Sequence, residues 1–247
     1  MDADGQSEFR SLVAKLNTIA YQCRPDIVFG VKILNSKVGK ATMEDFKEGQ
    51  RKLRKVKLLP IKLVFPKLGN IEELFLLGHG YAAIKSMPDK TTSVGGHVIM
   101  LCNERTNQVC VLSWRSKKIR RVVNSSLAGE ALATTDTIGK LVYQKAILVF
   151  IFGENMKDLP VIAATDSQNL HTAVHGTSLI EDAWTIPDIA CIKEAVEKKV
   201  INDLLKVRGE DMLANCLTKK GAGGAKLMEV LRTGKYKIPD DVKYLKA

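Results

Sequence analysis

The sequence predicts an α/β fold, a five-stranded mixed sheet flanked by helices and preceded by a small helical region. One observation is the order of elements after residue 71, where three extended segments are followed by alternating helical and extended ones. That order implies a mixed sheet with helices packed on its faces. The second is composition, because 45% of the 247 residues are apolar, which is typical of a packed globular protein.

Three helices are expected before the sheet, at residues 8–23, 27–34 and 42–57. The first has apolar residues at helical spacing, and Pro25 ends it because proline disfavours helix at the preceding residue. The third begins at Thr42, a suitable N-cap with Asp45 three residues later, and ends in a run of lysines and arginines. A short strand at residues 61–65 is expected to close this basic helical region.

The segments after residue 71 predict the strands of the sheet and the helices around it. Five strands are expected, at residues 72–84, 96–102, 109–114, 160–165 and 201–207. Helices are expected at residues 125–152, 167–175 and 187–199, with a further helix opening at Glu210. The polar stretch 103–107 has the composition of a hairpin loop between the second and third strands.

Charge and composition restrict the class of protein. The net charge is +11, and a basic balance of that size indicates a polyanionic partner such as nucleic acid, unless it reflects only a solvated lysine-rich surface. The five cysteines form no C-x-x-C pair, so neither a zinc site nor a disulfide framework is expected. Residues 1–8 do not resemble a signal peptide, and the longest apolar run, 146–152, is far shorter than the roughly 20 residues of a membrane helix. We expect a soluble intracellular protein, cytoplasmic or nuclear.

Several segments, taken in order, resemble the Ty1/copia family of retrotransposon Pol polyproteins. Residues 113–118 (S-W-R-S-K-K) and 126–130 (S-L-A-G-E) are similar to that family's S-W-x-S-K-K and S-T-L-A-A-E. Residues 165–167 (T-D-S) resemble its T-D-N, and 213–219 (L-A-N-C-L-T-K) resemble L-A-D-x-L-T-K. Residues 9–17 and 24–27 resemble the region that follows the polymerase palm. Together the matches span residues 9–232 in the family's order.

This resemblance implies an organisation into three parts. Residues 1–68 would be a helical remnant of the reverse transcriptase thumb or connection, residues 69–220 a ribonuclease H-like domain, and residues 221–247 a C-terminal tail. No Y-x-D-D loop precedes Pro25, so polymerase activity is not expected.

The same resemblance implies a degenerate active site. Ribonuclease H enzymes hydrolyse RNA in an RNA–DNA hybrid with two Mg²⁺ ions, which four carboxylates hold. Glu130 and Asp166 match two of these positions; without the motifs, Glu130 would pass for a solvated helix residue and Asp166 for a helix cap. The other two positions hold Tyr81 and Asn215, which carry no negative charge. Two-metal binding should therefore fail, and at most one weakly bound Mg²⁺ is expected on Glu130 and Asp166, because magnesium often uses one or two carboxylates plus substrate phosphates.

A dense basic cluster precedes the long helix and is expected to contact phosphates without reading sequence. Its members are Arg115, Lys117, Lys118, Arg120 and Arg121. Three functions remain open at this point. The chain could be an inactive ribonuclease H-like module that binds RNA–DNA hybrid or other nucleic acid, an active Mg²⁺-dependent ribonuclease with a remodelled site, or a protein-interaction scaffold without a nucleic-acid role.

Overall fold

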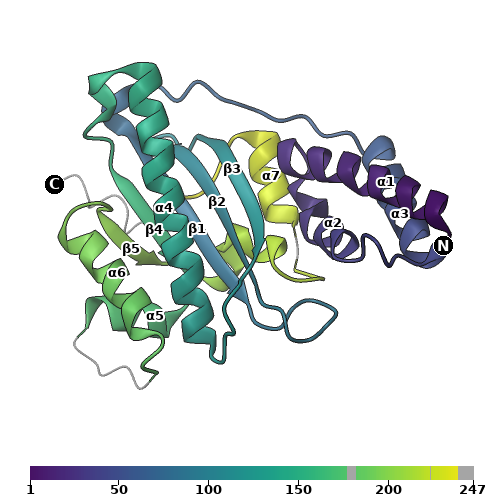
Figure 1. Cartoon of the computed structure of the whole chain (residues 1–247). Helices are drawn as coiled ribbons and strands as arrows, with labels where there is room; N and C mark the ends of the chain where they lie inside the picture. The colour runs from purple at the N-terminus through teal and green to yellow at the C-terminus, as the bar shows by residue number, and fades with distance from the viewer. Residues whose placement is uncertain (177–181, 223, 239–247) are drawn as a thin grey trace.

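The computed structural model describes residues 1–176, 182–222 and 224–238 and contains one five-stranded sheet (Figure 1). The strand order is β3-β2-β1-β4-β5. The strands are β1 (Leu74–Ala83), β2 (Val94–Asn103), β3 (Val109–Lys118), β4 (Val161–Thr165) and β5 (Asp203–Lys206). The first three pair antiparallel, whereas β4 lies parallel to β1 and β5 parallel to β4. The predicted mixed sheet is thus confirmed, and its fold is ribonuclease H-like.

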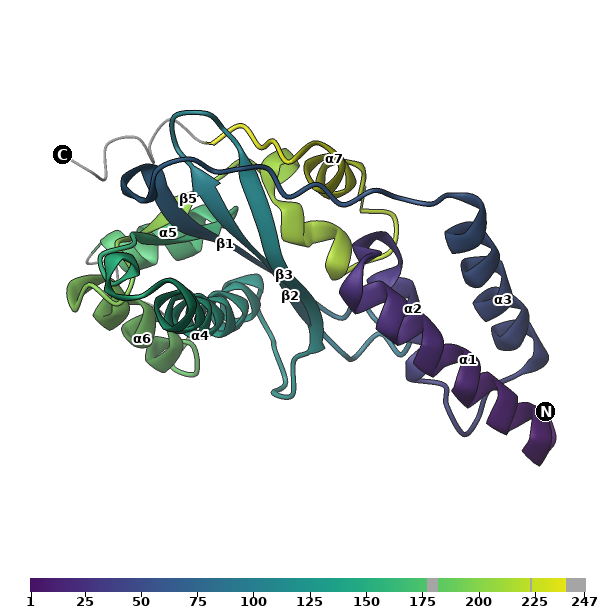
Figure 2. The same cartoon turned by 90° about the horizontal axis from the view of Figure 1, so that it is seen from above.

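Helices cover both faces of the sheet (Figure 2). One face carries α4 (Ser126–Phe152), α5 (Gln168–His175) and α6 (Ile186–Glu197), and their apolar residues form one core cluster with Leu74 and Leu76 of β1. The other face carries α7 (Ala225–Thr233) and two short 3₁₀ helices, η4 (Gly209–Asp211) and η5 (Leu213–Leu217). Phe75 and Leu77 point to this second face, because neighbouring strand residues face opposite sides.

Two glycines let α4 lie unusually close to β1. Gly78 and Gly80 continue the face of β1 that α4 covers, and a Cβ on Gly80 would lie 2.6 Å from the Thr137 hydroxyl oxygen. A Cβ on Gly78 would lie 2.8 Å from the Leu141 side chain. The bare backbone at both positions therefore allows the helix that carries Glu130 to pack directly onto the central strand.

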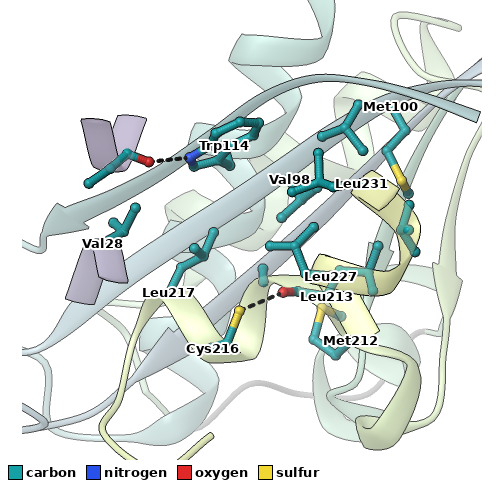
Figure 3. Packing of buried hydrophobic residues seen from close by; sticks show 14 of the residues in the cluster. Val28, Val98, Met100, Trp114, Met212, Leu213, Cys216, Leu217, Leu227 and Leu231 are labelled. Atoms are coloured by element: carbon teal, nitrogen blue, oxygen red, sulfur yellow. Dashed lines mark hydrogen bonds between the residues drawn. The ribbon is translucent and has the colours of Figure 1, made fainter. Parts of the chain in front are cut away.

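The N-terminal helices pack against the edge of the same core. They are α1 (Ala3–Gln22), α2 (Val28–Asn35) and α3 (Met43–Leu58). Thr42 and Asp45 form the predicted capping box at the start of α3. The Trp114 indole of β3 donates a hydrogen bond of 2.9 Å to the Ala20 carbonyl oxygen, and Val28 packs with the sheet residues around it (Figure 3). One apolar cluster therefore joins α1, α2, the sheet and α7.

Four sequence-based expectations need correction. Residues 61–65 are not a strand, because Pro60 and Pro66 flank them and the Val64 N–H bonds the Leu231 carbonyl of α7 instead of a neighbouring strand. No α-helix opens at Glu210; instead η4 and η5 follow, and nearly all of η5 is buried. The first helix begins earlier, at Ala3, where the Asp2 carboxylate caps it. Strand β3 extends four residues beyond Trp114, to Lys118.

Within the part of the chain that the structure describes, no helix is both long and apolar enough to cross a membrane. All five cysteines are free thiols.

Candidate functional site

The candidate site lies at the carboxyl ends of β1 and β4, beside the start of α4. The last residue pair of the parallel β1–β4 ladder is His79 with Ala164. Tyr81 and Asp166 each follow two residues later, so the parallel register brings both to the same end of the sheet. Glu130 is in the second turn of α4, whose first turn is capped by the Ser125 side chain.

Glu130 is held inside the protein rather than in solvent. Its side chain is only 7% exposed, and its Oε1 accepts a hydrogen bond of 3.3 Å from the Ala82 N–H of β1. Its Oε2 is buried and has no hydrogen-bond partner among the residues that the structure describes. Burial and then the negative charge of Asp166 raise the pKa of Glu130 to about 8. The electrostatic effect of Asp166 therefore reaches Glu130.

Asp166 is half-buried just beyond the end of β4. Burial raises the pKa of Asp166, while the nearby ammonium groups of Lys219 and Lys206 oppose that shift. Lys219 likewise lowers the pKa of Glu130. A single cation, Lys219, thus acts on both carboxylates.

Tyr81 is in direct contact with Lys219. The Lys219 ammonium donates a hydrogen bond of 2.9 Å to the Tyr81 phenol oxygen and lies 5.0 Å from the centre of its ring. Lys219 belongs to the L-A-N-C-L-T-K segment at residues 213–219. The sequence did not predict its contact with Tyr81, because only the buried turn of η5 directs Lys219 toward β1. The structure therefore brings Tyr81, Glu130, Asp166 and Lys219 to one end of the sheet.

Asn215 is joined to this group less directly. It lies in η5, and its side-chain oxygen is buried without a hydrogen-bond partner in the described part of the chain. η5 is tied to β1 through the Leu213 N–H, which donates to His79 Nδ1 at 3.4 Å, and Lys219, two residues after η5, also contacts β1. No contact of Asn215 with Tyr81, Glu130 or Asp166 occurs among the hydrogen bonds of the described residues.

The donor set does not fit two magnesium ions. Two Mg²⁺ carry four positive charges and prefer oxygen ligands, usually carboxylates. Here Glu130 and Asp166 are carboxylates, Tyr81 is a phenol, and Asn215 offers a neutral amide oxygen. Among the described residues, no group of three or more His, Cys, Asp and Glu side chains could hold a metal ion.

The residues of the predicted basic cluster line two separate hollows in the surface. Lys117, Lys118, Arg120 and Arg121 line a groove of about 730 Å³ between the end of β3 and α4. Within it, Lys117 is paired with Asp136 at 2.7 Å and Arg121 with Asp188. Lys118 and Arg120 form no ion pair with any residue that the structure describes.

Arg115 does not line that groove. It lines a second hollow, which Lys117, Lys118 and Arg120 also reach, together with Tyr21 of α1 and Lys32 of α2. Burial, then Arg115 and Lys118, lower the pKa of Lys32 to about 8, and its ammonium donates to the Ser116 carbonyl at 3.0 Å. Lys32 was not predicted as a surface cation, because only the packing of α2 against β3 brings it there.

Comparisons with known proteins find sequence similarity to transposon proteins. No family model matches the sequence. The chain is 26% identical over 215 residues to a retrovirus-related Pol polyprotein from transposon RE1 of Arabidopsis thaliana, and 25% identical over 213 residues to the RE2 counterpart. Each match covers 86% of this chain and 14% of the relative, so the chain spans about one seventh of the length of these proteins.

Solved structures give more distant similarities. A ribonuclease H1 named LC11, in complex with an RNA/DNA hybrid, is 17% identical with a TM-score of 0.41, over 59% of this chain and 93% of that one. The ribonuclease H1 of the halophilic archaeon Halobacterium salinarum NRC-1 is 13% identical with a TM-score of 0.39, over 59% of this chain and 93% of that one. These similarities are too distant to indicate a function. The chain is thus similar in sequence to retrotransposon Pol polyproteins over most of its length, and its five-stranded mixed sheet has a ribonuclease H-like fold.

Proposed function

We propose that this chain is a ribonuclease H-like module that binds RNA–DNA hybrid or other nucleic acid through its basic surface and cleaves it poorly or not at all. The observation that carries the proposal is the Tyr81–Lys219 contact at the position where the family has a metal-bridging carboxylate. A neutral phenol bound to an ammonium supplies no negative charge for a second metal ion. Catalysis by this family needs two such ions, one at the attacking water and one at the leaving oxygen.

The proposal includes weak binding of a single Mg²⁺ by Glu130 and Asp166. These two side chains would hold the ion, and it would supply charge to a bound phosphate. The protein's own contribution is then to orient the strand and not to hydrolyse it.

The binding half of the proposal rests on the groove between β3 and α4. Lys118 and Arg120 are exposed and form no ion pair with a described residue, so both are available to phosphates. Contacts of this kind release counterions from nucleic acid, so the affinity should fall steeply with salt. They position a backbone and carry no sequence information, so little sequence preference is expected.

The activity test is cleavage of an RNA–DNA hybrid by the purified chain in Mg²⁺ and in Mn²⁺. We expect a rate near background, because loss of one transition-state stabiliser typically costs about 10²–10³ in rate and two ligand positions are changed here. Tyr81→Asp with Asn215→Asp would restore four carboxylates, and cleavage would return only if the groups that orient the ligands are intact. Robust cleavage by the unmodified chain, abolished by Glu130→Gln, would establish the alternative of an active ribonuclease with a remodelled site.

The binding test compares two variants of equal net charge. Lys118→Gln with Arg120→Gln should weaken hybrid binding for all sequences and reduce its salt dependence by about two counterions. Lys157→Gln with Lys198→Gln, which removes two exposed lysines that are paired with Glu154 and Glu194, should change binding little. Neutralising all five cluster residues should have the largest effect. Affinity that is unchanged between low and physiological salt would favour the remaining alternative, a protein-interaction scaffold.

A further inference from the structure

We propose that the second hollow binds a single-stranded nucleic-acid segment, which continues from a hybrid held in the groove between β3 and α4. The cations of the hollow contact the phosphates, and Tyr21 stacks against a base. This inference deepens the proposed function and rests on it, because the single strand is an extension of the hybrid. It names the substrate class as a hybrid with a single-stranded overhang.

The second hollow is lined by cations without an acidic neighbour. Its volume is about 530 Å³, within the range of about 300–1,000 Å³ that is typical of ligand sites. Among the described residues, no Asp or Glu lines it, and Lys117 alone of its cations forms an ion pair. The cations are Lys32, Arg115, Lys117, Lys118 and Arg120. Like charges gathered in this way repel one another, and a bound phosphate would relieve that repulsion.

Lys32 is held at the wall of this hollow. Its ammonium donates a hydrogen bond of 3.0 Å to the Ser116 carbonyl oxygen of β3, which also accepts one of 3.0 Å from the Tyr21 hydroxyl. Burial and then the positive charges of Arg115 and Lys118 lower the pKa of Lys32 to about 8. An ammonium has three N–H donors, and this hydrogen bond is the one that Lys32 forms with the described residues. Donors therefore remain for an anion.

Aromatic side chains continue the same surface beyond the cations. Tyr21 is exposed and lines both the second hollow and a third one of about 270 Å³, which the exposed Phe65 also lines. Among the described residues, no Asp or Glu lines this third hollow either. The hydrogen bond to Ser116 limits the movement of the Tyr21 side chain. Aromatic rings beside cations are typical of sites for single-stranded nucleic acid, because every base can stack on a ring.

The end of β3 joins these hollows to the groove. β3 is an edge strand of the sheet, and α1 and α2 lie beside it (Figure 2). The groove and the second hollow share Lys117, Lys118 and Arg120, so the basic surface continues from α4 across the end of β3 to α1. A duplex is stiff and would continue along its own axis, whereas a single strand can bend around the end of β3. A single strand therefore fits this path better than a duplex.

The test compares two affinities of the full chain at physiological salt. One is for a blunt RNA–DNA hybrid, and the other is for the same hybrid with an overhang of about ten nucleotides, of DNA in one arm and of RNA in a second. The overhang should tighten binding by about tenfold, the effect of about one stacked base. A gain in either arm supports the inference, and the larger gain identifies the strand. No gain in either arm would overturn it, while binding of the blunt hybrid would still support the proposed function.

Variants assign this gain to the second hollow. Tyr21→Ala should remove most of the gain, whereas Tyr21→Phe should keep it, because the ring that stacks is still present. Lys32→Gln should lower the gain about threefold, and the matched control Lys40→Gln should lower it less than about twofold. Lys40 is exposed, follows α2 and lines neither hollow. An unchanged gain in Tyr21→Ala, or equal gains in the two lysine variants, would contradict the inference.

Further measurements separate the remaining outcomes. If Lys32→Gln or Tyr21→Ala does not fold, Arg115→Gln decides, because Arg115 is exposed and lines the second hollow but not the groove. It should lower the gain about threefold, and an unchanged gain would refute the inference. If the blunt hybrid does not bind, the affinity for the isolated overhang strand is measured in the same variants. A poly-glutamate peptide that binds as tightly as that strand, and equally well to Tyr21→Ala, would assign the hollow to an acidic protein instead.

Discussion

At the scale of single residues, His79 shows how the fold constrains the chemistry next to the site. It is completely buried in β1, where its Nδ1 accepts from the Leu213 N–H and its ring packs edge-on against Tyr236 at 5.5 Å between ring centres. Burial lowers the pKa of His79 to about 3. The imidazole is therefore neutral in the folded protein, and it anchors η5, the element that leads to Lys219.

His79 should make the protein sensitive to acid. Between its unfolded pKa near 6.5 and its folded pKa near 3, the unfolded state binds a proton that the folded state does not. The free energy of unfolding should therefore fall as the pH decreases through this window, by about 3 kcal/mol at pH 4.5. His79→Asn keeps an acceptor for Leu213 and should flatten this dependence, even if it lowers stability at neutral pH. Urea denaturation at several pH values measures both slopes, and equal slopes would exclude His79 as the cause.

Residues of the site differ in how far the sequence could predict them. Glu130 and Asp166 follow from short motifs at the start of a long apolar helix and at the end of an apolar strand, so their elements were predictable. Lys219 and Lys32 were not, because a long side chain reaches a site only through the tertiary position of its backbone. Lys219 depends on a buried 3₁₀ turn, and Lys32 on the packing of α2 against β3.

At the scale of elements, segments with a local apolar pattern were predictable, and segments whose structure depends on distant parts of the chain were not. The helix α4 and the five strands have apolar patterns that local sequence determines. Residues 61–65 are apolar enough for a strand, but their backbone bonds to α7 and flanking prolines remove donors. Residues after Glu210 form 3₁₀ turns because burial of Leu213, Ala214 and Leu217 against β1 and β2 overrides helical propensity. Tertiary contacts therefore determine the backbone conformation of such segments.

The close contact of α4 with β1 yields a prediction at this scale. Gly80→Ala should cost about 2 kcal/mol, because the new Cβ would lie 2.6 Å from the Thr137 hydroxyl, which already donates to the Ala133 carbonyl. Gly139→Ala is the control. Gly139 lies in α4, at a position where a Cβ would meet open space. It should stabilise the protein by up to about 1 kcal/mol through helix propensity. Thermal unfolding measures both, and a neutral Gly80→Ala would mean that α4 can move off β1 without cost.

At the scale of the whole molecule, the helical region and the sheet share one apolar cluster. Phe9 and Leu16 of α1 are fully buried in the cluster that contains Val98 and Trp114 of the sheet. Hydrogen bonds cross the same boundary, from Trp114 to the Ala20 carbonyl and from Tyr21 to the Ser116 carbonyl at 3.0 Å. The sequence-based division at residues 68 and 69 therefore stays a proposal about ancestry, while the packing predicts that the two parts unfold together.

The two tryptophans allow a direct test of this cooperativity. Trp114 is 8% exposed between β3 and α1, whereas Trp184 is 85% exposed, so a Trp184→Phe variant reports only on that interface. If the chain unfolds as one unit, urea transitions followed by Trp114 fluorescence and by far-ultraviolet circular dichroism should coincide. Leu16→Ala, in α1, should shift both midpoints together, with a loss of about 2–5 kcal/mol. Two separated transitions, of which Leu16→Ala moves only the first, would instead show that residues 1–68 fold as a domain of their own and that their contact with the sheet contributes little to its stability.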